Sequence, residues 1–330
     1  MKELPPSLEE RPDPNGGAQR LSLAKLQEWE SLKLGMFIHF GMSTFDGDDH
    51  SMGDQPATLY APDKLDVAQW VSTARDAGMK YAILTTKHTA GHCLWPTDLT
   101  DYSVKNSGNT TDVVQVFCDE CRKKGVKPGL YYCSWDNHNT FGSITPGMAD
   151  ARKRAFVTTE YMDFQTRQIE ELLTRYGDIF EVWVDIPWVL PRAYRNDLYA
   201  HIAKLQPETF ILMNHGITDG REMETEDIWP SDLLSIERYP PPSPEGHIRW
   251  RPVEGKSYYV PGEVCDLLSP NWFHEPNDPT RPDLEVLAMT LLANTRNANM
   301  LLNVPPDKHG LIPQNFVDGL MTLRRNLDRL

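Results

Sequence analysis

The chain has 330 residues, 40% of them hydrophobic and 24% charged, and its formal net charge is −14 at pH 7. That length is enough to bury one large core, as in a barrel enzyme. The net charge would repel a phosphate-rich partner and no cluster of Lys and Arg offsets it, so we expect no binding to nucleic acid. No apolar stretch approaches the roughly 20 residues of a membrane helix, which predicts a soluble protein with no membrane partner.

Residues 1–20 predict a polar leader that lacks the apolar segment of a signal peptide. The sequence is compatible with more than one compartment. If a leader was removed, the protein is periplasmic or extracellular, and otherwise it is cytoplasmic. The sequence is likewise compatible with a monomer or a homo-oligomer. The cysteines are odd in number and no second CxxC or His pair completes a zinc site, so we interpret them as reduced core thiols. They are Cys93, Cys118, Cys121, Cys133 and Cys265.

Four short apolar runs predict buried parallel strands, because they are rich in aromatic and β-branched residues and end on polar groups. They span residues 34–41, 80–88, 127–135 and 180–188. Helical patterns separate them, and two of these patterns follow Asp66 and Asp112, both suitable N-cap residues. The repeated order of strand, loop and helix is typical of a chain of βα units.

Further strand candidates span residues 209–215, 232–239, 256–264 and 299–304, and Pro313 opens a terminal helix. Eight strands predict a (β/α)8 barrel that forms a single domain over residues 21–330. Between residues 216 and 298 only residues 283–294 have a helical pattern, so we expect an irregular second half. An open doubly wound sheet is the alternative, although no glycine-rich phosphate loop follows the first strand.

Polar groups at the ends of these runs are candidates for a site, because the carboxyl ends of parallel barrel strands meet at one face. A single polar residue at a strand end is ordinary. Asp185 is less so, because apolar neighbours flank it on both sides and an unpaired buried carboxylate is costly. The strand-end groups are His39, Lys87, His88, Trp135, Asp136, Asp185, Asn214, His215, Glu237 and Glu263.

Two carboxylates in an aromatic cup suggest acid/base or nucleophilic chemistry on a sugar, whose ring stacks on aromatic faces. Trp95, Trp135, Trp183 and Trp188 fall at or just past strand ends. We expect half of these four tryptophans to lie in the site, because most tryptophans pack in a core.

Five stretches resemble glycoside hydrolase family 29, the α-L-fucosidases. They are LGMFIHFG, AGMKYAILTTKHTAGHCLWPTDLTDYSVKNS, CRKKGVKPGLYYCSWD, EVWVDIPW and NANMLLNVPPDKHGLIP. The resemblance implies retaining hydrolysis of α-L-fucosides through a covalent glycosyl-enzyme intermediate, with no cofactor and no metal. It also implies an oligosaccharide or glycoconjugate substrate.

The same resemblance implies roles for individual residues. Asp185 matches the nucleophile, and His39 and His88 match histidines that contact sugar hydroxyls. The pocket for the methyl group of fucose would be lined by Phe37, Tyr131 and Trp183. Trp95 and Trp135 are further candidates for substrate contact.

The acid/base residue is less clearly marked. We favour Glu237, which ends a strand-like run after the nucleophile, over Glu263, and Glu224 and Glu226 are further candidates. The stretch around Glu263 leads on to Trp272, Phe273 and His274, and we interpret it as wall and subsite residues.

Three departures from the family pattern bear on specificity. Thr89 replaces the second histidine of a K-H-H motif, His92 replaces an aromatic residue, and Asp49 and His50 occupy the place of a Glu-Trp pair. We therefore expect Asp49, His50 and His92 to contact the substrate. A glycone such as α-L-galactoside is an alternative to fucose, with His92 near its added hydroxyl. Many relatives also carry a C-terminal β-sandwich, whereas this chain ends at its closing helix.

Two rival functions remain. A metal-dependent barrel hydrolase would use His39, His88, His92 and Asp185 as ligands, although such sites usually present an H-x-H on the first strand. A catalytically inactive sugar-binding barrel would keep the aromatic residues and lose a carboxylate, but Asp185 is present.

Overall fold

The computed structural model describes residues 16–141, 152–214, 228–242 and 245–330. His215, Glu224 and Glu226, all named above as candidates, lie outside the described residues, as does most of the expected leader. The boundary of the domain near residue 20 therefore stays a prediction.

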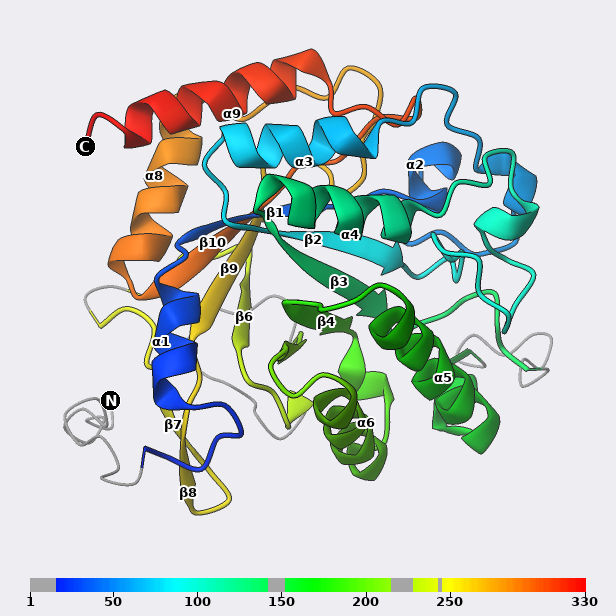
Figure 1. The fold of residues 1–330 in the computed structure, drawn as a ribbon, viewed down its shortest axis with the longest axis horizontal. Coiled ribbons are helices and arrows are strands. Elements are labelled where there is room, and N and C mark those ends of the chain that lie inside the picture. Colours follow the sequence, from blue (N-terminus) through cyan, green and yellow to red (C-terminus); the bar gives the residue numbers. More distant parts are fainter. Residues whose placement is uncertain (1–15, 142–151, 215–227, 243–244) are drawn as a thin grey trace.

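Eight parallel strands form one sheet with the order β5-β4-β3-β2-β1-β10-β9-β6. Its two edge strands meet, because a parallel bridge joins Leu212 of β5 to Leu233 just before β6. The (β/α)8 barrel is thus confirmed and the open sheet is wrong (Figure 1). The strands are β1 Leu34–Ile38, β2 Tyr81–Lys87, β3 Lys127–Cys133, β4 Glu181–Asp185, β5 Phe210–Met213, β6 Leu234–Glu237, β9 Gly262–Leu267 and β10 Ala298–Asn303.

Helices cover the outside of this sheet (Figure 1). Asp66 and Asp112 cap two of them as expected, with side chains that accept from the backbone N–H groups of Gln69 and Gln115. Helices α1, α2 and α6 were not predicted. The α-helices are α1 Leu23–Glu30, α2 Met42–Asp46, α3 Val67–Asp76, α4 Val113–Lys124, α5 Thr159–Arg175, α6 Arg192–Leu205, α8 Asp283–Thr295 and α9 Gln314–Leu327.

The expected strand over residues 256–264 is wrong in its extent. Pro261 lacks an N–H group and interrupts the run. The part before it, β8 Lys256–Tyr259, pairs with β7 Trp250–Val253 in an antiparallel hairpin outside the barrel. The barrel strand β9 begins only at Gly262, so Glu263 lies at its amino-terminal end. The hairpin between β6 and β9 also confirms that the second half of the barrel is irregular.

Successive side chains of each strand point to opposite faces of the sheet, which divides the core in two. An inner cluster fills the barrel with residues such as Phe37, Ile83, Tyr131, Trp183 and Leu301. The residues between them on the strands belong to a second cluster that packs against the helices. The inner cluster therefore fills the barrel and forms a packed floor for a ligand that binds at the carboxyl ends of the strands.

The five cysteines are buried and free, as expected for reduced core thiols. Among the described residues, no helix combines the length and the apolar character needed to cross a bilayer.

Candidate active site

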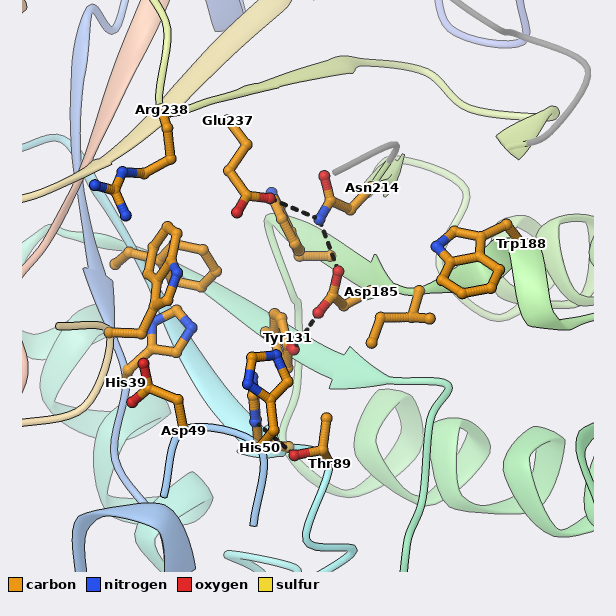
Figure 2. Close-up of a pocket in the computed structure, with 15 residues that line it drawn as sticks. His39, Asp49, His50, Thr89, Tyr131, Asp185, Trp188, Asn214, Glu237 and Arg238 are labelled. Atoms are coloured by element: carbon orange, nitrogen blue, oxygen red, sulfur yellow. Dashed lines mark hydrogen bonds between the residues drawn. The ribbon is translucent and has the colours of Figure 1, made fainter. Parts of the chain in front are cut away.

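A cavity of about 310 Å³ opens at the carboxyl ends of the barrel strands (Figure 2). It gathers most of the predicted site residues from β1, β2, β3, β4 and β6. The residues that line it are Phe37, His39, Asp49, His50, His88, Thr89, Tyr131, Trp183, Asp185, Ile186, Trp188, Asn214, Glu237, Arg238 and Trp272.

Asn214 links the two candidate catalytic carboxyl groups. Its Nδ2 atom donates to Asp185 Oδ1 at 2.7 Å and to Glu237 Oε2 at 3.4 Å (Figure 2). The two oxygen atoms therefore lie no farther apart than the sum of these distances. Retaining glycosidases hold their carboxyl groups about 5 to 5.5 Å apart, and inverting enzymes about 6.5 to 9.5 Å. That limit lies below the range of inverting enzymes, so the geometry favours a retaining arrangement.

The surroundings of these two carboxyl groups differ. Burial raises the pKa of Asp185, but the Tyr131 hydroxyl, which donates to Oδ2 at 2.6 Å, and the Asn214 amide both favour its ionised form. Burial and the negative charge of Asp185 raise the pKa of Glu237 to about 7. Asp185 is thus the better anion and Glu237 the better proton donor near neutral pH.

Two histidines face the pocket in their neutral form. Burial lowers the pKa of His39 to about 3 and the pKa of His88 well below its ordinary value. Asn303 uses its Nδ2 group to donate to the carbonyl oxygen of Trp272, so its Oδ1 atom accepts from His39 Nδ1 at 2.8 Å. The Nε2 atom of His39 is then left as an acceptor, which suits a hydroxyl group of a sugar.

Aromatic rings make up the floor and one wall of the pocket. Trp183 stacks on Tyr131 with ring centroids 5.6 Å apart, and Phe37 meets Trp183 edge-on at 5.2 Å. Asp49 accepts from the backbone N–H of Phe273 at 3.3 Å and so ties the loop that carries Trp272 to the loop after β1. Trp188 stands at the rim, with 51% of its surface exposed.

Four predicted substrate contacts do not line this cavity. The Gly91 turn, with φ of +83°, directs His92 away, and His92 Nε2 meets the Ser107 hydroxyl at 2.8 Å. Trp95 donates to Glu171 of α5, and Trp135 donates to Asn137 and packs on Phe156. Glu263 is buried at the amino-terminal end of the barrel.

His92 does not converge with the other three ligands that were suggested for a metal ion, because it meets Ser107 outside the cavity. Within the ranges that the structure describes, no three His, Cys, Asp or Glu side chains are placed to hold a metal ion.

Four residues of the pocket were given no role in catalysis or sugar binding from sequence. Asn214 was noted only as a strand end, Trp272 only as part of a wall, and Ile186 and Arg238 were missed. Arg238 follows Glu237 directly and has a φ of +67°, and its guanidinium meets Asp266 at 3.3 Å. Adjacency to Glu237 is the only signal that the sequence offers for it.

A model of the Alpha-L-fucosidase family matches residues 53–329. The chain belongs to the α-L-fucosidase family. Alpha-L-fucosidase 1 of Arabidopsis thaliana is 32% identical over 310 residues, which cover 89% of this chain and 57% of the relative. The bovine tissue alpha-L-fucosidase is 23% identical over 314 residues, which cover 89% and 59%. The chain thus spans little more than half the length of these relatives.

Solved structures agree with this membership. Alpha-L-fucosidase isoenzyme 1 from Paenibacillus thiaminolyticus has a TM-score of 0.76 and 27% identity, over 92% of this chain and 75% of that chain. A glycoside hydrolase 29 family member from an unknown rumen bacterium has a TM-score of 0.74 and 26% identity, over 92% and 56%. The family predicted from the five sequence stretches is confirmed.

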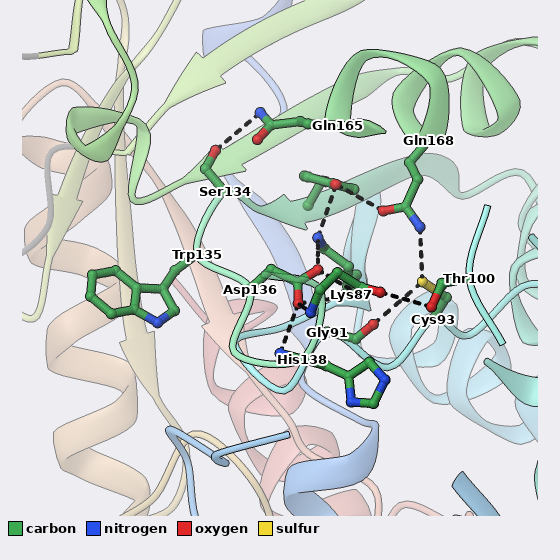
Figure 3. Close-up of polar contacts among 12 residues, drawn as sticks. Lys87, Gly91, Cys93, Thr100, Ser134, Trp135, Asp136, His138, Gln165 and Gln168 are labelled. Atoms are coloured by element: carbon green, nitrogen blue, oxygen red, sulfur yellow. Dashed lines mark hydrogen bonds and ion pairs between the residues drawn. The ribbon is translucent and has the colours of Figure 1, made fainter. Parts of the chain in front are cut away.

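A buried ion pair supports the pocket of this family member from outside the barrel. Lys87 Nζ lies 2.8 Å from Asp136 Oδ2, and both side chains are fully buried (Figure 3). Burial alone would raise the pKa of Asp136, but the Lys87 ammonium and the N–H groups of Asn139 hold it below its ordinary value. The pair joins the end of β2, where His88 and Thr89 enter the pocket, to the chain after β3.

We expect Lys87→Met to lower the free energy of unfolding by about 3–5 kcal/mol, because it leaves Asp136 buried without its cation. Urea unfolding monitored by circular dichroism measures this loss. The control is Arg167→Met, which removes an exposed pair with Asp163 on α5 and should cost less than about 1 kcal/mol. Equal losses in the two variants would contradict the role of the buried pair.

Proposed function

We propose that this chain hydrolyses α-L-fucosides with retention of anomeric configuration, with Asp185 as the nucleophile and Glu237 as the acid/base residue. The observation that carries the proposal is the single Asn214 amide that contacts both carboxyl groups inside an aromatic-lined pocket. Family membership supports the choice of reaction, and the short distance between the carboxyl groups supports retention.

In the first step a carboxylate oxygen of Asp185 bonds to the anomeric carbon, the glycosidic bond breaks, and Glu237 gives its proton to the leaving oxygen. In the second step Glu237 takes a proton from water as the water oxygen bonds to the same carbon, which releases Asp185. Tyr131 and Asn214 hold the Asp185 carboxylate in place through both steps. No step needs a cofactor.

The pocket favours fucose over L-galactose as the glycone. Phe37, Tyr131, Trp183 and Trp272 offer apolar surface to a methyl group. His92, the expected partner of the added hydroxyl of L-galactose, is turned toward Ser107 instead. Neutral His39 and His88 are suited to bind the ring hydroxyls.

Activity on aryl α-L-fucoside, α-L-galactoside, β-D-galactoside and α-L-arabinoside tests this proposal, with NMR of the first-formed anomer. We expect the α-L-fucoside to be hydrolysed fastest and α-L-fucose to appear first. Hydrolysis of none of the four would favour the sugar-binding barrel, and β-L-fucose as the first product would exclude retention.

Removal of the nucleophile gives a second test. We expect Asp185→Ala to lower kcat by roughly 10⁴-fold or more, because no covalent intermediate can form. Added azide should restore part of the activity and yield the β-L-fucosyl azide, since it attacks from the side that the carboxylate has left. A β-azide from Glu237→Ala and none from Asp185→Ala would mean that the two roles are exchanged.

The pH dependence of kcat/KM reports the same two groups. Activity should fall as the pH rises through about 7, because Glu237 then loses the proton that the leaving oxygen needs. Asn214 lowers the pKa of both carboxyl groups, so Asn214→Ala should move both limbs of the profile to higher pH. Limbs that stay in place, or move to lower pH, would contradict the bridging role of Asn214.

A further inference from the structure

Two carboxyl groups that the proposed reaction does not use lie inside the barrel below the pocket. Glu181 is the first residue of β4 and Glu263 the second residue of β9, and both are completely buried. Lys87 neutralises Asp136 elsewhere in the core, but here the two acids face each other.

Three donors reach this pair. Glu263 Oε1 accepts from the Tyr81 hydroxyl at 2.6 Å, and Glu263 Oε2 accepts from Trp183 Nε1 at 3.0 Å. Glu181 Oε2 accepts from Trp29 Nε1 at 3.0 Å. The remaining oxygen, Glu181 Oε1, is buried and receives no hydrogen bond from a donor group.

A proton shared by Glu181 and Glu263 would give the unpartnered Glu181 oxygen a hydrogen-bond partner. A hydrogen on Glu181 Oε1 would donate to the Glu263 carboxylate, so that the unpartnered oxygen becomes a donor and one negative charge remains. The titratable groups that face the pair are Tyr81 from β2, Cys265 from β9 and Asp232 before β6, which is bound to Arg20. None of these three is a cation. Burial also raises the pKa of Glu263 to about 7 and that of Glu181 well above its ordinary value.

The pair reaches the pocket through one side chain. Trp183 lines the cavity with its ring, and the same ring donates its N–H downward to Glu263. We propose that Glu263, joined to Glu181 by a proton, is a positioning residue that fixes the Trp183 indole as the floor of the sugar site. The sugar part of this inference rests on the proposed function, whereas the positioning of the indole does not.

The positioning can be tested without a substrate, by the indole N–H signals of ¹⁵N-labelled protein. The Trp183 signal is assigned by its loss in Trp183→Phe. We expect slow exchange of this proton with solvent in the wild type and about 10-fold faster exchange in Glu263→Leu, because the buried donor loses its acceptor. Glu263→Gln should keep the protection, since its amide oxygen can still accept. Equal exchange rates in the wild type and Glu263→Leu would overturn the proposal.

Kinetics test the consequence for the site. We expect Glu263→Leu to raise the inhibition constant of L-fucose about 10-fold and Glu263→Gln to raise it less than about 3-fold. Trp183→Phe combined with Glu263→Leu should be no worse than the more harmful single variant, because both act through one contact. If the effects of the two substitutions on the inhibition constant multiply, the inference is wrong. A wild type that binds no fucose would refute the proposed function, and the indole exchange would still decide the positioning.

The shared proton is tested by Glu181→Gln, which also serves if Glu263→Leu does not fold. Its amide would donate permanently to Glu263 and still accept from Trp29. Because the buried acids have raised pKa values, their contribution to stability is complete below about pH 4.5 and is lost as the pH rises through those values, which is about 7 for Glu263. We expect the Tm of Glu181→Gln to fall less than that of the wild type between pH 5 and 9. The exposed control Glu28→Gln should follow the wild type, and an equal fall in Glu181→Gln would exclude the proton.

Discussion

The hydrogen bonds of Asn214 are the constraint on which the site depends. Its backbone N–H donates to the carbonyl of Val184 at 2.8 Å, which places Asn214 beside the last residue of β4. The Ser235 hydroxyl meets Asn214 Oδ1, which turns the NH₂ group toward both carboxyl groups. Residues from three neighbouring parts of the barrel thus fix one nitrogen, and that nitrogen sets the distance between Asp185 and Glu237.

Much of the fold and the centre of the site could be predicted, because both follow from local patterns. Short apolar runs marked the strands, and parallel strands bring their carboxyl ends to one face. His39, His88, Asp185 and Glu237 were predicted in this way, and all four line the cavity. The rule fails once the chain has left the strand, since the direction of a side chain there depends on the turn. The Gly91 turn directs His92 away from the cavity. Trp95 points to α5, and Trp135 points to Phe156.

Glu263 shows a second kind of failure. The apolar run around it was continuous enough to be counted as one strand, but Pro261 divides it into a hairpin strand and a barrel strand. A shift in where the strand begins moved Glu263 from the expected carboxyl end to the opposite end of the barrel. A glutamate in a strand-like run suggested an acid/base, yet its position depends on pairing with β10, which no local pattern reveals.

The strand β4 connects the two acid pairs. Glu181, Trp183 and Asp185 alternate along Glu181–Asp185 and point inward, so one five-residue strand supplies the lower acid, the floor and the proposed nucleophile. Each acid on β4 faces a glutamate from another strand, and neither pair contains a cation. The raised pKa values favour a proton on each pair near neutral pH: on Glu237 for the leaving group of the proposed reaction, and between Glu181 and Glu263 for the proposed support of the indole. The loss of protons above neutral pH would thus weaken catalysis and the support of the pocket together.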